Sequence, residues 1–106
     1  MTAATYELSD IADGYVDEIF RYSRQTWGDE QARRYVSGLY DCFAAIANRH
    51  VPWRTIDADL GNGYVCRYER HRVYWRAIDD RRVVILAVLH ESMHESGRLR
   101  HAIEGS

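Results

Sequence analysis

The segment His90-Glu91-Ser92-Met93-His94 has the spacing of a zinc-hydrolase motif. On a helix, histidines four residues apart share one face and bind Zn²⁺, while the glutamate polarises the bound water. Three observations argue against that chemistry. The seven aliphatic residues 83–89 predict a strand before His90, residue 100 is arginine where a longer zinc-peptidase pattern needs a third histidine, and only twelve residues follow the motif. We therefore expect no metal and no cofactor, and a zinc hydrolase remains the remotest alternative.

The basic residues are of one type, since all 14 are arginine and the chain has no lysine. Any mechanism that needs an amine, such as a Schiff base or a lysine general base, is therefore excluded. The formal net charge is −2. Residues 1–62 hold 6 arginines and 10 acidic residues, whereas residues 63–106 hold 8 arginines and 6 acidic residues. The second half is the more basic one.

Arginines alternate with apolar residues in the segment 72–78, as in a strand with one polar face. We expect the apolar set, Val73, Trp75 and Ala77, to pack against helices. The opposite set is Arg72, Tyr74 and Arg76, joined by Arg67 from the neighbouring strand. This second face is interpreted either as a solvated surface or as a docking face for an acidic protein partner or nucleic acid.

Two helices are predicted to hold this strand in place. Residues 5–9 alternate and form a short strand, after which Ser9 or Asp10 starts a helix that ends at Gly28. Asp29 is expected to cap a second helix, whose apolar stripe extends over residues 32–47. A break this short makes the pair an antiparallel helical hairpin. Trp27 and Trp75 are expected in the core.

The hydrophobic period changes from 3.6 to 2 after a loop at residues 51–63. Three strands are predicted, at residues 64–69, 72–78 and 83–90, with turns at Arg70-His71 and Asp79-Asp80. The last strand is apolar on both faces and is therefore central. One face carries Val83, Ile85, Ala87 and Leu89, and the other carries Val84, Leu86 and Val88.

The predicted fold is α+β with the order β-α-α-β-β-β, in which the helical hairpin packs on one face of a small, mostly antiparallel sheet. We expect a single domain over residues 1–106, with a short polar tail at residues 97–106. The longest apolar run, residues 83–89, has seven residues and is too short to span a bilayer, which takes about 20. The N-terminus lacks the features of a secretory signal, and Cys42 and Cys66 are expected to be buried thiols. A cytoplasmic protein is therefore predicted.

An ordered set of positions resembles the ParE branch of the RelE/ParE toxin superfamily, from about residue 6 to residue 99. The first half contributes Tyr6-x-Leu8-Ser9, Asp17-x-Ile19-x-x-Tyr22, Trp27-Gly28 and Gln31-Ala32-x-x-Tyr35. The second half contributes His71-x-Val73-Tyr74-Trp75-Arg76, Val84-Ile85-Leu86-x-Val88-Leu89-His90 and Met93. In this family the residues around His90 form the end of the last strand, which replaces the zinc interpretation.

The resemblance implies the toxin of a type II toxin–antitoxin module, of the kind involved in plasmid stabilisation and stress response. Such toxins are cytoplasmic and are neutralised by a small ParD-like, ribbon-helix-helix antitoxin in a hetero-oligomer. The ParE branch implies inhibition of DNA gyrase without enzymatic activity, with no direct nucleic-acid binding and no membrane contact. The expected partner-binding residues are Arg67, Arg72, Tyr74, Arg76, His90, Met93, Arg98 and Leu99.

The RelE branch implies the alternative, a ribosome-dependent mRNA endoribonuclease. Cleavage of RNA needs a base, a cation and an acid. The residues that could supply them are Arg72, Tyr74, Arg76, His90 and Glu91. The missing lysine, the tryptophan–glycine junction and the net charge of −2 favour gyrase inhibition. His90 is the histidine to test first, whereas His71 is interpreted as a turn residue with local hydrogen bonds.

Overall fold

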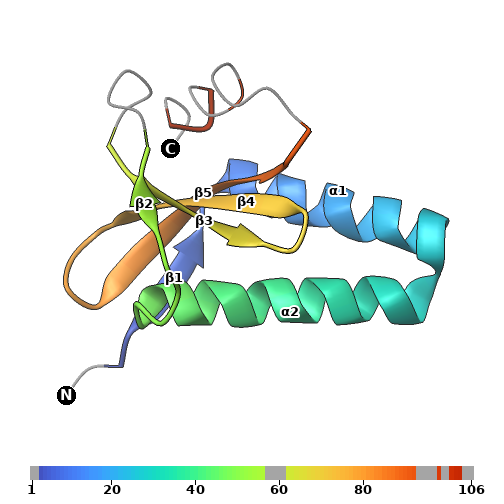
Figure 1. Cartoon of the computed structure of the whole chain (residues 1–106), viewed down its shortest axis with the longest axis horizontal. Coiled ribbons are helices and arrows are strands. Elements are labelled where there is room, and N and C mark those ends of the chain that lie inside the picture. The colour runs from blue at the N-terminus through green and yellow to red at the C-terminus, as the bar shows by residue number, and fades with distance from the viewer. Residues whose placement is uncertain (1–2, 57–61, 93–97, 99–100, 104–106) are drawn as a thin grey trace.

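The computed structural model describes residues 3–56, 62–92, 98 and 101–103 (Figure 1). The elements are β1 (Thr5–Leu8), α1 (Asp10–Trp27), α2 (Asp29–Ala47), β2 (Arg54–Thr55), β3 (Tyr64–Tyr68), β4 (His71–Ala77) and β5 (Arg82–His90). The predicted α+β class and element order are confirmed, and the short β2 is an addition within the expected loop. Among the described helices, none is long and apolar enough to cross a membrane.

A single glycine joins the two helices. The Ser9 hydroxyl accepts a hydrogen bond from the backbone N–H of Ala12 at 3.0 Å and so caps α1. Gly28 has φ +96°, a conformation that favours glycine. It is both the C-cap of α1 and the N-cap of α2. The capping role expected for Asp29 is wrong, because this residue is already in the first turn of α2 and no side chain caps that helix.

The strands form a five-stranded sheet in the order β1-β5-β4-β3-β2. β1 runs parallel to β5, and the three other strand pairs are antiparallel. The sheet is therefore mostly antiparallel and has β5 between two neighbours, as predicted. The observed turn between β3 and β4 is at Glu69 and Arg70, one residue earlier than expected, so His71 belongs to β4.

The sheet has an apolar core on each face. On the helix side, residues of α1 and α2 pack against Cys66, Val73, Trp75, Val83, Ile85 and Val88. On the other side, the cluster consists of Ile56, Val65, Tyr74, Leu86, Ala87, Leu89 and Ala102. Trp75 is 1% exposed and lies in the core as expected. The core position predicted for Trp27 is wrong, since this side chain at the end of α1 is 57% exposed, and Ala77 is exposed as well.

A β-bulge interrupts the alternation of β5. Tyr74 is opposite Ala87 and Trp75 is opposite Ile85, so Leu86 has no partner of its own on β4. Leu86 and Ala87 consequently face the same side, and Val88 faces the helices. The faces predicted for Ala87, Val88 and Leu89 are therefore wrong, because one extra residue reverses the pattern that follows it.

Candidate partner-binding site

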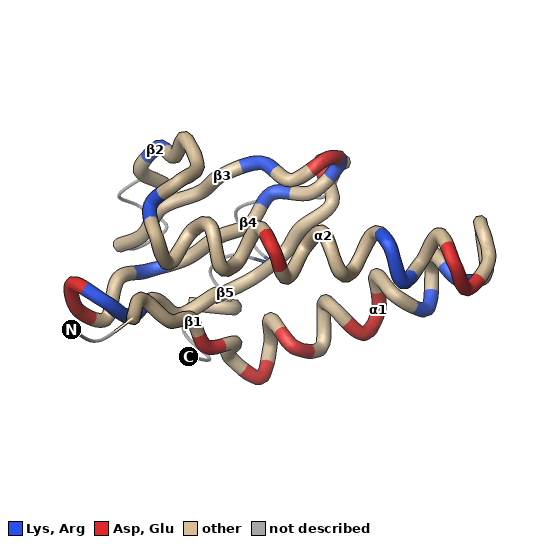
Figure 2. Tube along the Cα trace, turned by 90° about the horizontal axis from the view of Figure 1, so that it is seen from below, with Lys and Arg blue, Asp and Glu red and all other residues tan. Residues whose placement is uncertain are grey.

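Three arginines of β3 and β4 form one polar surface, which we call the arginine face: Arg67, Arg72 and Arg76. Arg67 is directly opposite Arg72 across the antiparallel pair, and Arg76 follows two alternations later on β4. Arg67 is exposed, and the other two are partly buried. Figure 2 shows basic positions on both strands, while acidic positions occupy the first half of α1.

Tyr74 lies beneath the arginine face. Its side chain is 0% exposed and packs with Leu86, Leu89 and Ala102. The exposure expected for Tyr74 is wrong, because residues 101–103 form a helical turn on this side of the sheet (Figure 1). The alternation of β4 identified the correct face, but it could not show that a distant segment covers the ring.

Glu91 gathers arginines at the end of the sheet. Its carboxylate is 2.6 Å from a terminal nitrogen of Arg67 and 3.7 Å from one of Arg70. A terminal nitrogen of Arg72 also donates to the Glu91 carbonyl oxygen at 3.4 Å. Exposed ion pairs contribute little to folding, typically below about 1 kcal/mol. Their effect here is to orient the guanidinium groups and to hold the Glu91 carboxylate in ion pairs.

His71 connects this end of the sheet to α2. Its Nδ1 is 2.6 Å from the Tyr35 hydroxyl, and its ring contacts that of His90, its partner across β4 and β5. The hydroxyl hydrogen of Tyr35 can point at Nδ1 of a neutral His71. The local turn contacts expected for His71 are wrong, because its partner is 36 residues away.

Burial controls the protonation of this cluster. Burial and, to a smaller extent, the nearby His90 together lower the pKa of His71 to about 4. Burial also raises the pKa of Tyr35, and it raises the pKa of Tyr68 to about 12. The Tyr68 hydroxyl donates to the Tyr35 carbonyl oxygen at 2.8 Å. Tyr35, Tyr68 and His71 are thus neutral and hydrogen-bonded at neutral pH. Sequence reasoning missed Tyr35 because its contact with His71 depends on how α2 packs on the sheet.

His90 is the last residue of β5, as predicted, and is followed by a turn. Its Nδ1 accepts a hydrogen bond from the backbone N–H of Ser92 at 3.1 Å and is 2.7 Å from the Ser92 hydroxyl. The described residues hold no group of three His, Cys, Asp or Glu side chains that could bind a metal. His94, the second histidine of the zinc motif, lies outside them.

The remaining predicted residues are scattered or not described. Arg76 is opposite Val84, five residues along β4 from His71 and therefore roughly 16 Å from the histidine pair. Arg98 is exposed, and Met93 and Leu99 lie outside the described residues. The structure thus brings Arg67, Arg72, His90 and Glu91 to one end of the sheet and leaves Arg76 at the other.

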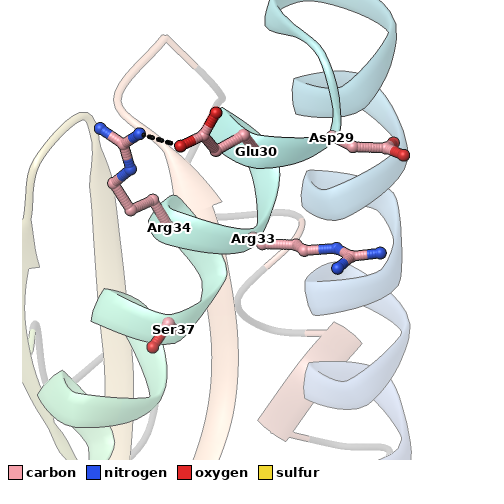
Figure 3. Close-up of a pocket in the computed structure, with 5 residues that line it drawn as sticks. All are labelled: Asp29, Glu30, Arg33, Arg34 and Ser37. Atoms are coloured by element: carbon pink, nitrogen blue, oxygen red, sulfur yellow. Dashed lines mark hydrogen bonds and ion pairs between the residues drawn. The ribbon is translucent and has the colours of Figure 1, made fainter.

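An open hollow of about 530 Å³ lies along the first turns of α2 (Figure 3). Its lining consists of Asp29, Glu30, Arg33, Arg34 and Ser37. Arg34 and Glu30 are paired at 2.9 Å, one helical turn apart. None of the predicted site residues lines it, and its charged lining suits solvent rather than an apolar ligand.

Comparisons with known proteins identify related chains. The family model described as the ParE toxin of the type II toxin–antitoxin system parDE matches residues 6–95. Toxin ParE of Escherichia coli is 30% identical over 105 residues, which cover 99% of this chain and 100% of the relative. Toxin ParE1 of Caulobacter vibrioides is 38% identical over 95 residues, covering 89% of this chain and 96% of the relative.

A solved structure shares the fold. It is the toxin–antitoxin complex RelBE2 from Mycobacterium tuberculosis, which aligns with a TM-score of 0.61 at 17% identity. The alignment covers 84% of this chain and 99% of the other one. At this identity the likeness is one of architecture, and it agrees with the helical hairpin and sheet described above.

Proposed function

The chain belongs to the ParE toxin family of type II toxin–antitoxin systems, and from this membership we propose that it inhibits DNA gyrase and thereby arrests replication. It is the toxin of such a module. The proposal includes action in the cytoplasm as a single toxin domain and neutralisation by a cognate antitoxin. The alternative is the RelE-type cleavage of mRNA on the ribosome.

The incomplete assembly of the candidate nuclease residues is the observation that favours gyrase inhibition. Arg72, His90 and Glu91 share one end of the sheet, but Arg76 and Tyr74 do not join them in an exposed site. RNA cleavage needs acid, base and cation around a single phosphate. Arg76 is roughly 16 Å along β4 from His71 and His90, Tyr74 is buried, and the Glu91 carboxylate is held by two arginines. A nuclease mechanism would have to reassemble these groups, whereas binding to a protein target needs only a complementary surface.

We further propose that the antitoxin is ParD-like, with a ribbon-helix-helix domain, and forms a hetero-oligomer with the toxin. An acidic segment of this antitoxin would complement the arginine face. His90, Met93, Arg98 and Leu99 are proposed to extend the same contact. Tyr74 would support this contact indirectly, because it lies between the arginines of β4 and its buried ring packs in the apolar cluster on that side of the sheet.

The decisive experiment for the target is a supercoiling assay with purified toxin and DNA gyrase. Excess toxin is expected to block supercoiling, and co-purified antitoxin is expected to restore it. Primer extension on messages after induction in cells serves as the second arm. Normal supercoiling together with cuts inside translated codons, lost in His90→Ala, would instead establish the nuclease.

The partner surface is tested separately by calorimetry with the antitoxin encoded beside the toxin. Arg72→Ala is expected to weaken the complex about 5-fold or more, since loss of a charged contact at an interface costs roughly 1 kcal/mol or more. Arg21→Ala on the exposed side of α1 is the matched control and should leave the affinity unchanged. Equal affinities for both variants would place the antitoxin elsewhere.

A further inference from the structure

A carboxylate of the chain itself lies among the arginines at the end of the sheet. Arg67 on β3 and Arg72 on β4 are directly opposite each other, and Arg70 lies in the turn between these strands. We call these three residues the arginine cluster. One oxygen of Glu91 is 2.6 Å from a terminal nitrogen of Arg67, and the other is 3.7 Å from a terminal nitrogen of Arg70. Guanidinium groups pair readily with carboxylates, so Glu91 shows which chemical group the cluster accommodates.

The backbone of Glu91 is anchored independently of its carboxylate. Its N–H donates to the carbonyl oxygen of Arg70 at 2.9 Å. Its carbonyl oxygen accepts a hydrogen bond from a terminal nitrogen of Arg72 at 3.4 Å. Rotation of the Glu91 side chain alone would therefore release the guanidinium groups of Arg67 and Arg70 while both backbone contacts stay in place.

The two guanidinium groups that hold the carboxylate are accessible to a partner. The exposed fraction of the side chain is 68% for Arg67 and 75% for Arg70, against 35% for Glu91. Nε of Arg67 also donates to the carbonyl oxygen of Glu69 at 2.8 Å, which fixes the guanidinium in position. Exposed ion pairs are weak, so a second carboxylate can compete with Glu91 for the same donors.

We propose that the arginine cluster is a carboxylate-binding site with Glu91 as its internal occupant, which an acidic side chain of the partner displaces. This inference rests on the proposed docking of an acidic antitoxin segment, and it adds that binding exchanges one ion pair for another. The apparent affinity of a ligand falls with the fraction of molecules whose site is open to it. Glu91 therefore lowers the affinity of the cluster for every other carboxylate.

A titration of the purified toxin with a synthetic hexaglutamate peptide tests this exchange. Nuclear magnetic resonance follows the guanidinium signals of the arginines and gives the dissociation constant. Glu91→Gln removes the internal carboxylate and should bind the peptide about 3- to 5-fold more tightly than the wild type, as expected when a competing exposed ion pair is lost. Failure of Glu91→Gln to bind the peptide would overturn the proposal.

Glu69→Gln is the matched control for the loss of one negative charge. Glu69 is exposed in the neighbouring turn, and the substitution retains the backbone carbonyl oxygen that holds Arg67. Within the described part of the chain, the ion pairs at this end of the sheet are made by Glu91 and none by the Glu69 carboxylate. We expect the peptide affinity to change by less than about 2-fold. An equal gain in both variants would also overturn the proposal, since only the total charge would then matter.

A double-mutant cycle with Arg67→Ala identifies the exchanged pair. In the wild type, Arg67 loses its pair with Glu91 when it binds the peptide, so Arg67→Ala should weaken binding only slightly. In the Glu91→Gln background no internal pair is lost, and the same substitution should weaken binding by a further factor of about 3 to 5. Equal effects in the two backgrounds would contradict the exchange.

Calorimetry of the same variants with the antitoxin encoded beside the toxin separates this inference from the proposed docking. A gain in antitoxin affinity in Glu91→Gln, absent in Glu69→Gln, is expected if the antitoxin supplies the displacing carboxylate. If the peptide affinities change as expected but the antitoxin affinities do not, the carboxylate site is supported and the proposed docking of the antitoxin is wrong. The peptide measurements thus decide this inference, and the antitoxin measurements decide the docking surface.

Discussion

The hydrogen bond between Tyr35 and His71 is the polar contact that joins α2 to the end of the sheet. It is partly buried and joins residues 36 positions apart in the sequence. A protonated His71 would have to turn its own Nδ1 hydrogen toward that hydroxyl and displace the hydrogen already there. The contact is therefore tied to the neutral histidine.

This gives the folded protein a specific pH dependence. The pKa of His71 is about 4 in the fold, against about 6.5 in an unfolded chain. Between these values the unfolded state binds the extra proton, so stability is lost as the pH falls from about 6.5 to about 4. Allowing for the partial exposure of the ring, we expect a loss of about 1–2 kcal/mol.

Urea unfolding at a series of pH values measures this loss. In His71→Gln the amide oxygen accepts from Tyr35 but does not titrate, so its stability should change less over the same range. His50→Gln, at an exposed histidine, is the control and should retain the slope of the wild type. A wild-type slope in His71→Gln would contradict the assignment.

A second prediction at the residue scale concerns Gly38. A Cβ here would overlap the Tyr68 hydroxyl, whereas a Cβ at Gly14 in α1 meets open space. Alanine stabilises a helix by roughly 1 kcal/mol over glycine, so Gly14→Ala should be stabilising. Gly38→Ala should instead destabilise by about 1–2 kcal/mol, because the tyrosine must move and lose its bond to Tyr35.

Thermal or urea unfolding of a double-mutant cycle tests the cause. In a Tyr68→Phe background the overlapping hydroxyl is gone and only a tight ring contact remains, so the helix gain of alanine should offset that contact and Gly38→Ala should become close to neutral. An equally large loss in both backgrounds would mean that the overlap is not what excludes a side chain at Gly38.

At the scale of elements, the bulge in β5 and the start of α1 support each other. The Ser9 hydroxyl accepts from Ala12 and donates to the carbonyl oxygen of Leu86, the bulged residue, at 3.2 Å. The Ser9 backbone N–H also donates to the Ile85 carbonyl oxygen at 3.1 Å. A single serine thus joins the first strand, the first helix and the central strand.

Replacing this serine should have a measurable cost. Ser9→Ala removes the helix cap and the bond to Leu86, and we expect a loss of about 1–2 kcal/mol in the free energy of unfolding. Ser9→Thr retains the hydroxyl and should stay within about 0.5 kcal/mol of the wild type. If both variants unfold like the wild type in urea, the hydroxyl does not stabilise this junction.

The same elements show what the sequence can and cannot predict. The helical hairpin, the strand order along the chain and the central position of β5 follow from hydrophobic period and from the turn at Gly28. The bulge is not visible in a uniformly aliphatic strand, because apolar residues on both faces leave no alternation to break. The cover over Tyr74 was missed for a related reason, since burial by a distant segment depends on tertiary packing.

At the scale of the whole molecule, the two sides of the sheet differ in charge and in the segments that pack on them. Acidic positions gather on α1, and the arginine face lies on β3 and β4 (Figure 2). On that second side, Ala102 is 0% exposed and completes the cluster around Tyr74, Leu86 and Leu89. Ala102 is thus part of the core, with the partly buried Ile103 packed against it, although the sequence suggests only a polar tail.

Introducing a charged side chain at Ala102 tests whether this residue belongs to the core. Ala102→Glu would bury a carboxylate without a partner and should destabilise the toxin by about 3 kcal/mol. His101→Glu, at the exposed neighbour, should cost less than about 0.5 kcal/mol. Differential scanning calorimetry should therefore show a much lower melting temperature only for the first variant. Similar melting temperatures for the two would show that the turn does not seal the cluster.

The parallel pairing of β1 with β5 also governs when the protein can fold during translation. Thr5 pairs with Arg82 and Leu8 with Ile85, so the first strand waits for residues made more than 70 positions later. Both cores include residues of β5, so the helical hairpin cannot complete its packing on the sheet before that strand has left the ribosome. Long-range pairing of this kind slows folding. A nascent chain therefore passes most of its synthesis without the complete sheet, and the proposed partner-binding surface cannot be fully supported from below until β5 is available.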